Sequence, residues 1–179
     1  MVVELRPHQQ EVLGKLSNGK VLLGGVGSGK TVTSLAYYWT KVMNGTLNDP
    51  LSVNRDLLPI FVITTARKRD DLDWQRWAAR MWLYDHITVD SYNNIEKYKE
   101  VENAFFIFDE QRLVGAGAWS KAFIEIAKRN QWILLSATPG DVWEDYIPLF
   151  IANGWYKNRS EFKQNHCVYS YYGRYPKLE

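Results

Sequence analysis

The amino-acid sequence predicts an α/β fold in which helices cover both faces of a mostly parallel central sheet. Five short apolar runs recur along the 179 residues, and each is bounded by residues that favour turns or helix caps. The runs lack the polar and apolar alternation of a half-buried strand, as expected for strands that are covered on both faces. Stretches of helical length separate them, which indicates βαβ units. The predicted strands are residues 21–23, 60–64, 87–89, 104–108 and 132–135.

Six segments around these strands have the length and the end signals of helices. In the first of them, Pro7 suits the opening turn. In the third, Trp74 and Trp77 fall at helical spacing with two further apolar residues, so we expect them in the core rather than on a stacking platform. Residues 44–59 are rich in turn-forming residues and predict a long connection. The predicted helices are residues 7–16, 30–43, 66–81, 92–100, 118–128 and 142–151.

Length and composition limit the domain organisation and the classes of function. The chain fits one domain, which we place at residues 1–153, followed by an extension at residues 154–179. A hydrophobic content of 46% and a charged content of 23% are ordinary for a folded domain. The net charge of +2 is too small to indicate nucleic-acid binding by itself. No apolar run approaches the roughly 20 residues of a membrane span, so we expect a cytoplasmic protein without a membrane partner.

The clearest motif is the run GGVGSGKT at residues 24–31, which satisfies the phosphate-loop pattern G-x-x-x-x-G-K-[ST]. Glycines let backbone N–H groups turn inward to form an anion site, and the next helix directs its N-terminal dipole at the same phosphates. We expect Lys30 to contact the β- and γ-phosphates of ATP and Thr31 to ligate Mg²⁺. A chance glycine-rich turn is the alternative, but the strand before the loop and the helix after it are the context the motif requires. The candidate nucleotide ligands in the loop are Gly25, Gly27, Ser28, Gly29, Lys30 and Thr31.

Two acidic residues end the fourth predicted strand, in the run AFFIFDEQR. Asp109 and Glu110 stand at its carboxyl end, where α/β sheets place their ligands. Asp109 is the candidate to hold Mg²⁺ through its water shell, and Glu110 is the candidate base that orients or deprotonates the attacking water. A solvated acidic turn is the alternative. We favour the catalytic interpretation, with Lys30 as the third catalytic residue, because a phosphate loop precedes the pair.

A third motif, LLSATPGD, ends the fifth predicted strand. Ser136 and Thr138 are small hydroxyl residues that can hydrogen-bond both the catalytic carboxylates and a neighbouring element. The tripeptide S-A-T is weak evidence alone. Its position after the acidic strand strengthens it.

With these motifs in order, the sequence resembles the first motor domain of a superfamily II (DEAD/DEAH-like) helicase along nearly its whole length. Its tail is similar to phage-encoded and Snf2-like members, in which such a segment leads toward a second motor domain. The resemblance implies a RecA-like P-loop domain that binds Mg-ATP and acts on a nucleic acid, with DNA favoured over RNA. A phage origin would place it in the cytoplasm of a bacterial host cell.

The resemblance also assigns roles to further residues. In LRPHQQEVL it places the glutamine that contacts adenine at Gln9, with Gln10 as the second candidate. In FVITTARKRDDLDWQRW it places Thr65 and Arg67 near a nucleic-acid backbone, and in VDSYNN it does the same for Ser91. It gives Ser136 and Thr138 a role in coupling the nucleotide state to the nucleic-acid track. Lys68 and Arg69 either add to the nucleic-acid contacts or belong to a solvated helix start.

Two departures from the family pattern bear on activity. The acidic motif continues with Gln111 and Arg112, where the family usually ends in His or Asp. Motifs IV to VI are absent, so the resemblance implies a second RecA-like domain elsewhere in the protein. In the family that domain supplies arginine fingers, and a missing finger costs about 10³ to 10⁵ in rate, so we expect ATP binding here but poor hydrolysis.

Two other classes of function stay open. One is a P-loop phosphotransferase that passes the γ-phosphate to a small molecule. The other is a nucleotide-sensing interaction module whose partner carries the activity. The S-A-T-P segment and the glutamine-containing leader favour the helicase or translocase, because a small-molecule kinase needs neither.

Overall fold

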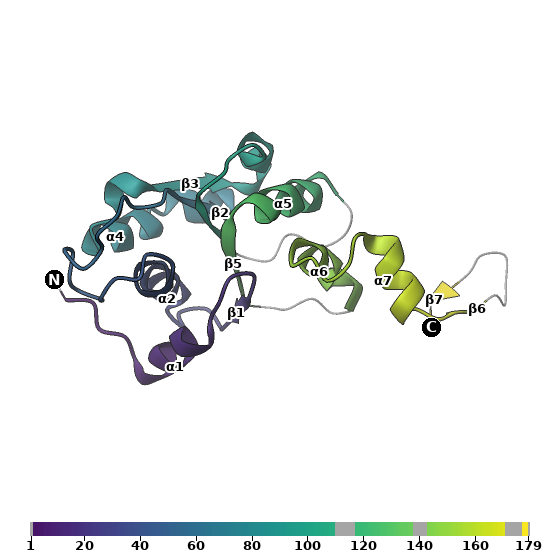
Figure 1. The fold of residues 1–179 in the computed structure, drawn as a ribbon, viewed down its shortest axis with the longest axis horizontal. Coiled ribbons are helices and arrows are strands. Elements are labelled where there is room, and N and C mark those ends of the chain that lie inside the picture. The colour runs from purple at the N-terminus through teal and green to yellow at the C-terminus, as the bar shows by residue number, and fades with distance from the viewer. Residues whose placement is uncertain (1, 110–116, 138–142, 171–176, 179) are drawn as a thin grey trace.

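The computed structural model describes residues 2–109, 117–137, 143–170 and 177–178 (Figure 1). Its centre is a five-stranded, all-parallel sheet in the order β1-β5-β4-β2-β3, which confirms the predicted α/β class. All five strands are predicted by the sequence, and the ends of the observed strands differ from the predicted ends by no more than two residues. The strands are β1 Val21–Leu23, β2 Ile60–Thr64, β3 Ile87–Ser91, β4 Phe105–Asp109 and β5 Gln131–Ser136.

The central strand β4 shows why its sequence is apolar throughout. Phe105 and Ile107 face one buried cluster, whereas Phe106 and Phe108 face a second cluster on the other side of the sheet. Successive side chains of a strand point to opposite faces, so a strand covered on both faces has no polar positions to offer. The same alternation places Asp109, at the end of β4, on the face of Phe105 and Ile107.

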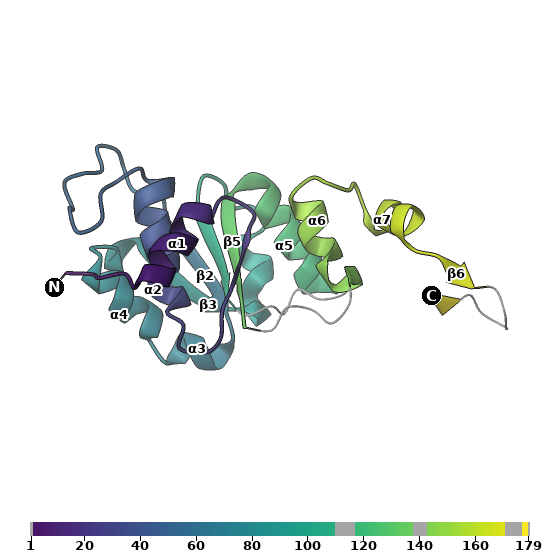
Figure 2. The ribbon, with the colours of Figure 1, turned by 90° about the horizontal axis from the view of Figure 1, so that it is seen from below.

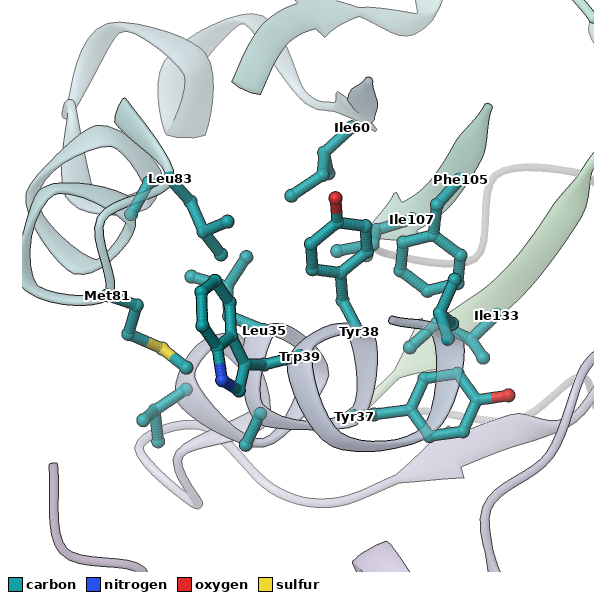
Figure 3. Packing of buried hydrophobic residues seen from close by; sticks show 14 of the residues in the cluster. Leu35, Tyr37, Tyr38, Trp39, Ile60, Met81, Leu83, Phe105, Ile107 and Ile133 are labelled. Carbon is teal, nitrogen blue, oxygen red and sulfur yellow. The ribbon is translucent and has the colours of Figure 1, made fainter. Parts of the chain in front are cut away.

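Helices cover both faces, as the sequence predicted. On one face lie α1 (Pro7–Lys15), α2 (Lys30–Tyr37) and α4 (Asp73–Arg80), and on the other lies α5 (Ala118–Arg129) (Figure 2). The π-helical segment η1 (Tyr38–Val42) continues α2. Figure 3 shows its Tyr38 and Trp39 pointing with Leu35 into the apolar cluster beneath the sheet. The Tyr38 hydroxyl, the one polar group of this side chain, donates to the Leu58 carbonyl at 2.6 Å. Burial raises the pKa of Tyr38.

The single helix predicted at residues 66–81 is wrong. The structure has two helices there, α3 (Ala66–Asp70) and α4, separated at Leu72, whose φ of +55° lies in the left-handed region. The break lets α3 pack against β3 while α4 packs against α2. Trp74 is buried in the core and Trp77 packs against it half-buried, as the spacing predicted.

Other elements differ from prediction in kind rather than in place. The segment predicted as helix 92–100 is the 3₁₀ helix η3 (Tyr92–Tyr98), and residues 44–59 form the expected long connection. Near residues 142–151 the structure has the short 3₁₀ segment η4 (Trp143–Tyr146) and α6 (Ile147–Ala152). The loop between α4 and β3 carries a further 3₁₀ turn, η2 (Tyr84–His86).

The sequence missed the secondary structure of the extension. The extension contains α7 (Arg159–His166), which Asn158 caps, and two short antiparallel strands, β6 (Tyr169–Ser170) and β7 (Lys177–Leu178). Both project beyond α6, away from the central sheet (Figures 1 and 2). The helix escaped detection because Phe162 is its one buried residue, so its apolar period is too weak to read.

Candidate nucleotide-binding site

The phosphate loop lies between β1 and α2, at the carboxyl end of the sheet. Gly29, the residue before α2, has a φ of +82°, and a Cβ there would fall 2.2 Å from the Nε2 atom of Gln9. Gly27 also has a positive φ, of +75°. Both backbone conformations favour glycine, and at Gly29 the motif itself specifies it.

Residues of the loop line a cavity of about 770 Å³. The Lys30 ammonium donates to the carbonyl oxygens of Gly24 and Gly25, the latter at 2.9 Å. The Ser28 hydroxyl is buried and has no hydrogen-bond partner among the described residues. A buried polar atom without a partner is costly, so this hydroxyl would gain a hydrogen bond by turning toward a ligand oxygen in the cavity. The volume is within the range of small-molecule sites, about 300 to 1,000 Å³.

Asp109 enters the same cavity from the end of β4 and is only 3% exposed. Its Oδ2 atom accepts hydrogen bonds from the Thr64 hydroxyl at 3.1 Å and from the Trp74 indole N–H at 3.3 Å. The Lys68 ammonium lies 3.4 Å from both carboxylate oxygens. The carboxylate is thus oriented by groups from β2, α3 and α4.

The donor set of this cavity suits Mg²⁺. Thr31 and Asp109 both line it, and hydroxyl and carboxylate oxygens are ligands that Mg²⁺ prefers. In nucleotide sites the remaining ligands are waters and phosphate oxygens, so one carboxylate and one hydroxyl from the protein are enough. Within the described ranges, no three His, Cys, Asp or Glu side chains cluster. Glu110, the candidate base, lies outside the described residues.

Strand β5 joins the loop strand to the acidic strand. Its register pairs Ser136 with Leu23 on one side and Leu135 with Asp109 on the other. The backbone N–H of Gly24 donates to the Ser136 carbonyl at 3.1 Å. Ser136 is therefore buried beside the first glycine of the loop, whereas Thr138, the other residue predicted to couple the sites, lies outside the described residues.

Gln9 lines the cavity, but its amide is already engaged. Its Oε1 atom accepts from the Arg6 backbone N–H at 2.8 Å, and its Nε2 atom donates to the Gly29 carbonyl at 3.3 Å. In this arrangement Gln9 connects the start of α1 to the phosphate loop. One N–H of Nε2 and one acceptor site of Oε1 remain for a contact with adenine. Gln10, the second candidate, is exposed and donates to the Leu5 carbonyl.

The three residues that are predicted to lie near a nucleic-acid backbone occupy different environments. Thr65 caps α3, because its hydroxyl accepts from the Lys68 backbone N–H at 3.3 Å. Arg67 is exposed on the same helix. Ser91 is 3% exposed, so its hydroxyl is not on the surface in this conformation.

Sequence reasoning missed two residues of the site. Trp74 was assigned to the core alone, and Lys68 to a nucleic-acid contact or a solvated helix start. Lys68 lies 41 residues from Asp109 in the chain, and no local spacing reveals a pair that the sheet brings together. The cavity also extends to Arg6, Arg76 and Trp77, which the sequence did not assign to it.

No protein-family model matches the sequence, and no curated protein matches it. Solved structures do match its fold. The Sulfolobus solfataricus SWI2/SNF2 ATPase core, solved in complex with double-stranded DNA, is similar with a TM-score of 0.69 and 19% identity over 90% of this chain. The Pyrococcus furiosus Hef helicase domain is similar with a TM-score of 0.57 and 16% identity over 84% of this chain. This chain spans 38% and 36% of those two chains, respectively.

The five-stranded parallel sheet and the glycine loop at its carboxyl end define a P-loop α/β domain. More particularly, the fold is the RecA-like fold that the SWI2/SNF2 ATPase core and the Hef helicase domain share. The identities are low, so the similarity establishes the shared fold. In the part of the chain that the structure describes, no helix has the length and apolar content to cross a bilayer.

Proposed function

We propose that this chain is the ATP-binding, N-terminal motor domain of a nucleic-acid-dependent ATPase, a helicase or DNA translocase of superfamily II. One observation carries the proposal: Lys30, Thr31 and Asp109 line a single cavity at the carboxyl edge of a RecA-like sheet. A glycine turn arising by chance would not bring a buried carboxylate from another strand to the same cavity.

We infer a task for each side chain from this arrangement. The N–H groups of the loop and the start of α2 bind phosphate oxygens. Lys30 leaves the carbonyls of Gly24 and Gly25 to contact the β- and γ-phosphates. Thr31 and Asp109 hold Mg²⁺, which when bound neutralises charge on the phosphate oxygens. Glu110 is the proposed base toward the attacking water.

The nucleic-acid side of the proposal rests on α3. Arg67 is exposed on this helix, and Thr65 fixes its first turn. Contacts of such residues with the phosphate backbone of a nucleic acid position the protein without recognising the base sequence. The double-stranded DNA in the SWI2/SNF2 complex supports DNA as the partner. A second RecA-like domain is the other proposed partner, and efficient hydrolysis is proposed to depend on its arginines.

Nucleotide binding is tested by titrating the chain with a fluorescent ATP analogue in Mg²⁺. We expect Lys30→Ala to weaken binding by about 10- to 100-fold, the worth of a charge-assisted contact to phosphate. Lys41→Ala is the matched control, because Lys41 is exposed and is not among the residues that line the cavity. Equal affinity in the Lys30 variant and the control would place the nucleotide elsewhere.

The motor assignment is tested by ATP turnover with and without single- and double-stranded DNA. A rate of ATP turnover that rises with DNA supports the proposal. The rise counts whether it occurs with this chain alone or only after a second motor domain is added. Turnover that ignores DNA but rises with a small phosphate acceptor would identify a phosphotransferase instead. Saturable ATP binding that DNA never affects would leave an interaction module.

A further inference from the structure

Resting on the proposed function, we propose that Lys68 is a positioning residue that occupies the cation position at Asp109 and competes with Mg²⁺ for this carboxylate. The nucleotide site would then hold its own counter-ion until the metal and the nucleotide arrive. This role differs from both sequence-based alternatives for Lys68, a nucleic-acid contact and a solvated helix start.

The geometry of the carboxylate supports this role. Asp109 is almost fully buried, and a buried carboxylate without compensation is strongly disfavoured. Two neutral donors, Thr64 and Trp74, are directed at its Oδ2 atom. Lys68 lies 3.4 Å from Oδ2 and equally 3.4 Å from Oδ1, the atom with no neutral donor among the described residues. The ammonium therefore stands at the oxygen that is best placed to accept a metal-bound water.

The backbone of α3 directs the lysine to this place. Thr65 accepts a hydrogen bond from the Lys68 N–H, which fixes the first turn of the helix directly after β2. Thr64, the last residue of β2, contacts the same carboxylate through its hydroxyl. The end of β2 and the start of α3 thus form one unit around Asp109, and Lys68 supplies its positive charge.

The pair can be displaced. The Lys68 side chain is 38% exposed, and its long flexible stem can carry the ammonium into solvent. A fully buried pair would be costly to separate, whereas a partly exposed one is weak. Two cations cannot share one carboxylate at close range without repulsion, so Mg²⁺ must move the ammonium aside. We therefore expect the wild-type chain to need a higher Mg²⁺ concentration for nucleotide binding than a variant without this ammonium.

The test compares the wild-type chain with Lys68→Met and Lys68→Arg. We expect the Mg²⁺ concentration for half-maximal binding of a fluorescent ATP analogue to fall about 3- to 10-fold in Lys68→Met, the range for a partly exposed ion pair. Lys68→Arg keeps the charge and should remain close to wild type. Lys121→Met, an exposed change on α5 at the other face of the sheet, is the control.

A second measurement separates this inference from the proposed function. Thermal unfolding is followed in Mg²⁺ alone, without nucleotide, and Lys68→Met should be stabilised at lower Mg²⁺ than wild type. Lys68→Gln, which keeps a hydrogen-bond donor, replaces it if the methionine variant does not fold. If no variant binds nucleotide, the proposed function fails and this unfolding measurement still decides the role of Lys68.

Equal Mg²⁺ dependence of wild type and Lys68→Met in both measurements would overturn the inference. A variant that loses affinity for ATP but not for ADP, with an unchanged Mg²⁺ requirement, would also overturn it. In that case Lys68 contacts the γ-phosphate rather than competing with the metal.

Discussion

Trp74→Phe tests whether the core of this domain and its candidate metal site are one structure. Trp74 is 2% exposed and donates its indole N–H to Asp109 at 3.3 Å. A lost hydrogen bond to a charged group costs about 1.5 to 3 kcal/mol, and the length of this one favours the lower end. The smaller ring adds a cavity cost of about 1 to 2 kcal/mol. The sum is about 3 kcal/mol, which for a domain of this size lowers Tm by about 6 to 12 °C.

Urea unfolding followed by circular dichroism measures this loss. The matched control is Trp77→Phe, one turn further along α4, because Trp77 is half-buried and its ring lies under Arg80 at 4.7 Å. We expect the control to lose about 1 kcal/mol, since an exposed cation–π contact contributes little more than that. In an Asp109→Ala background, Trp74→Phe should cost about 1 kcal/mol less than in wild type. Equal losses for the two tryptophans, or no coupling to Asp109, would refute the reasoning.

Two further predictions concern polar groups at the edges of the sheet. Asn130→Ala should cost about 2 to 4 kcal/mol in urea unfolding, because the buried amide accepts from the Ala104 N–H and donates to the carbonyls of Val101 and Ile126. The exposed Asn93→Ala is its control, and equal stability of the two variants would contradict the account. Burial acts to raise the pKa of Asp90, but hydrogen bonds from Asn94, the Ser91 N–H and Tyr98 outweigh it, and the pKa lies below the ordinary 3.8. The stability from Asp90 is therefore present above pH 3.8 and is lost as the pH falls below it. Asp90→Asn should flatten this acid limb, and an unchanged slope of unfolding free energy against pH would show that Asp90 does not cause it.

The sequence predicted the parts of this domain that depend on local pattern. Apolar runs located the five strands, and the glycine spacing located the phosphate loop, because a positive φ at Gly29 restricts residue choice wherever it occurs. The break at Leu72 could not be predicted, since leucine rarely adopts a positive φ and carries no turn signal. The contacts of Asp109 with Lys68 and Trp74 could not be predicted from the sequence for another reason. They join residues from three elements, and only the strand order places those elements together.

These contacts bear on how the two sides of the proposed motor communicate. Arg67 and Lys68 are consecutive residues of α3, yet one is exposed where a nucleic acid is proposed to bind and the other reaches the candidate metal ligand. Helical geometry turns neighbouring side chains about 100° apart, so one short helix serves both sides. A rigid shift of α3 that improves a phosphate contact at Arg67 would also move the backbone that carries Lys68. If nucleic acid at Arg67 changes the affinity of Asp109 for the metal by this route, linkage requires the metal to change the affinity for nucleic acid by the same factor.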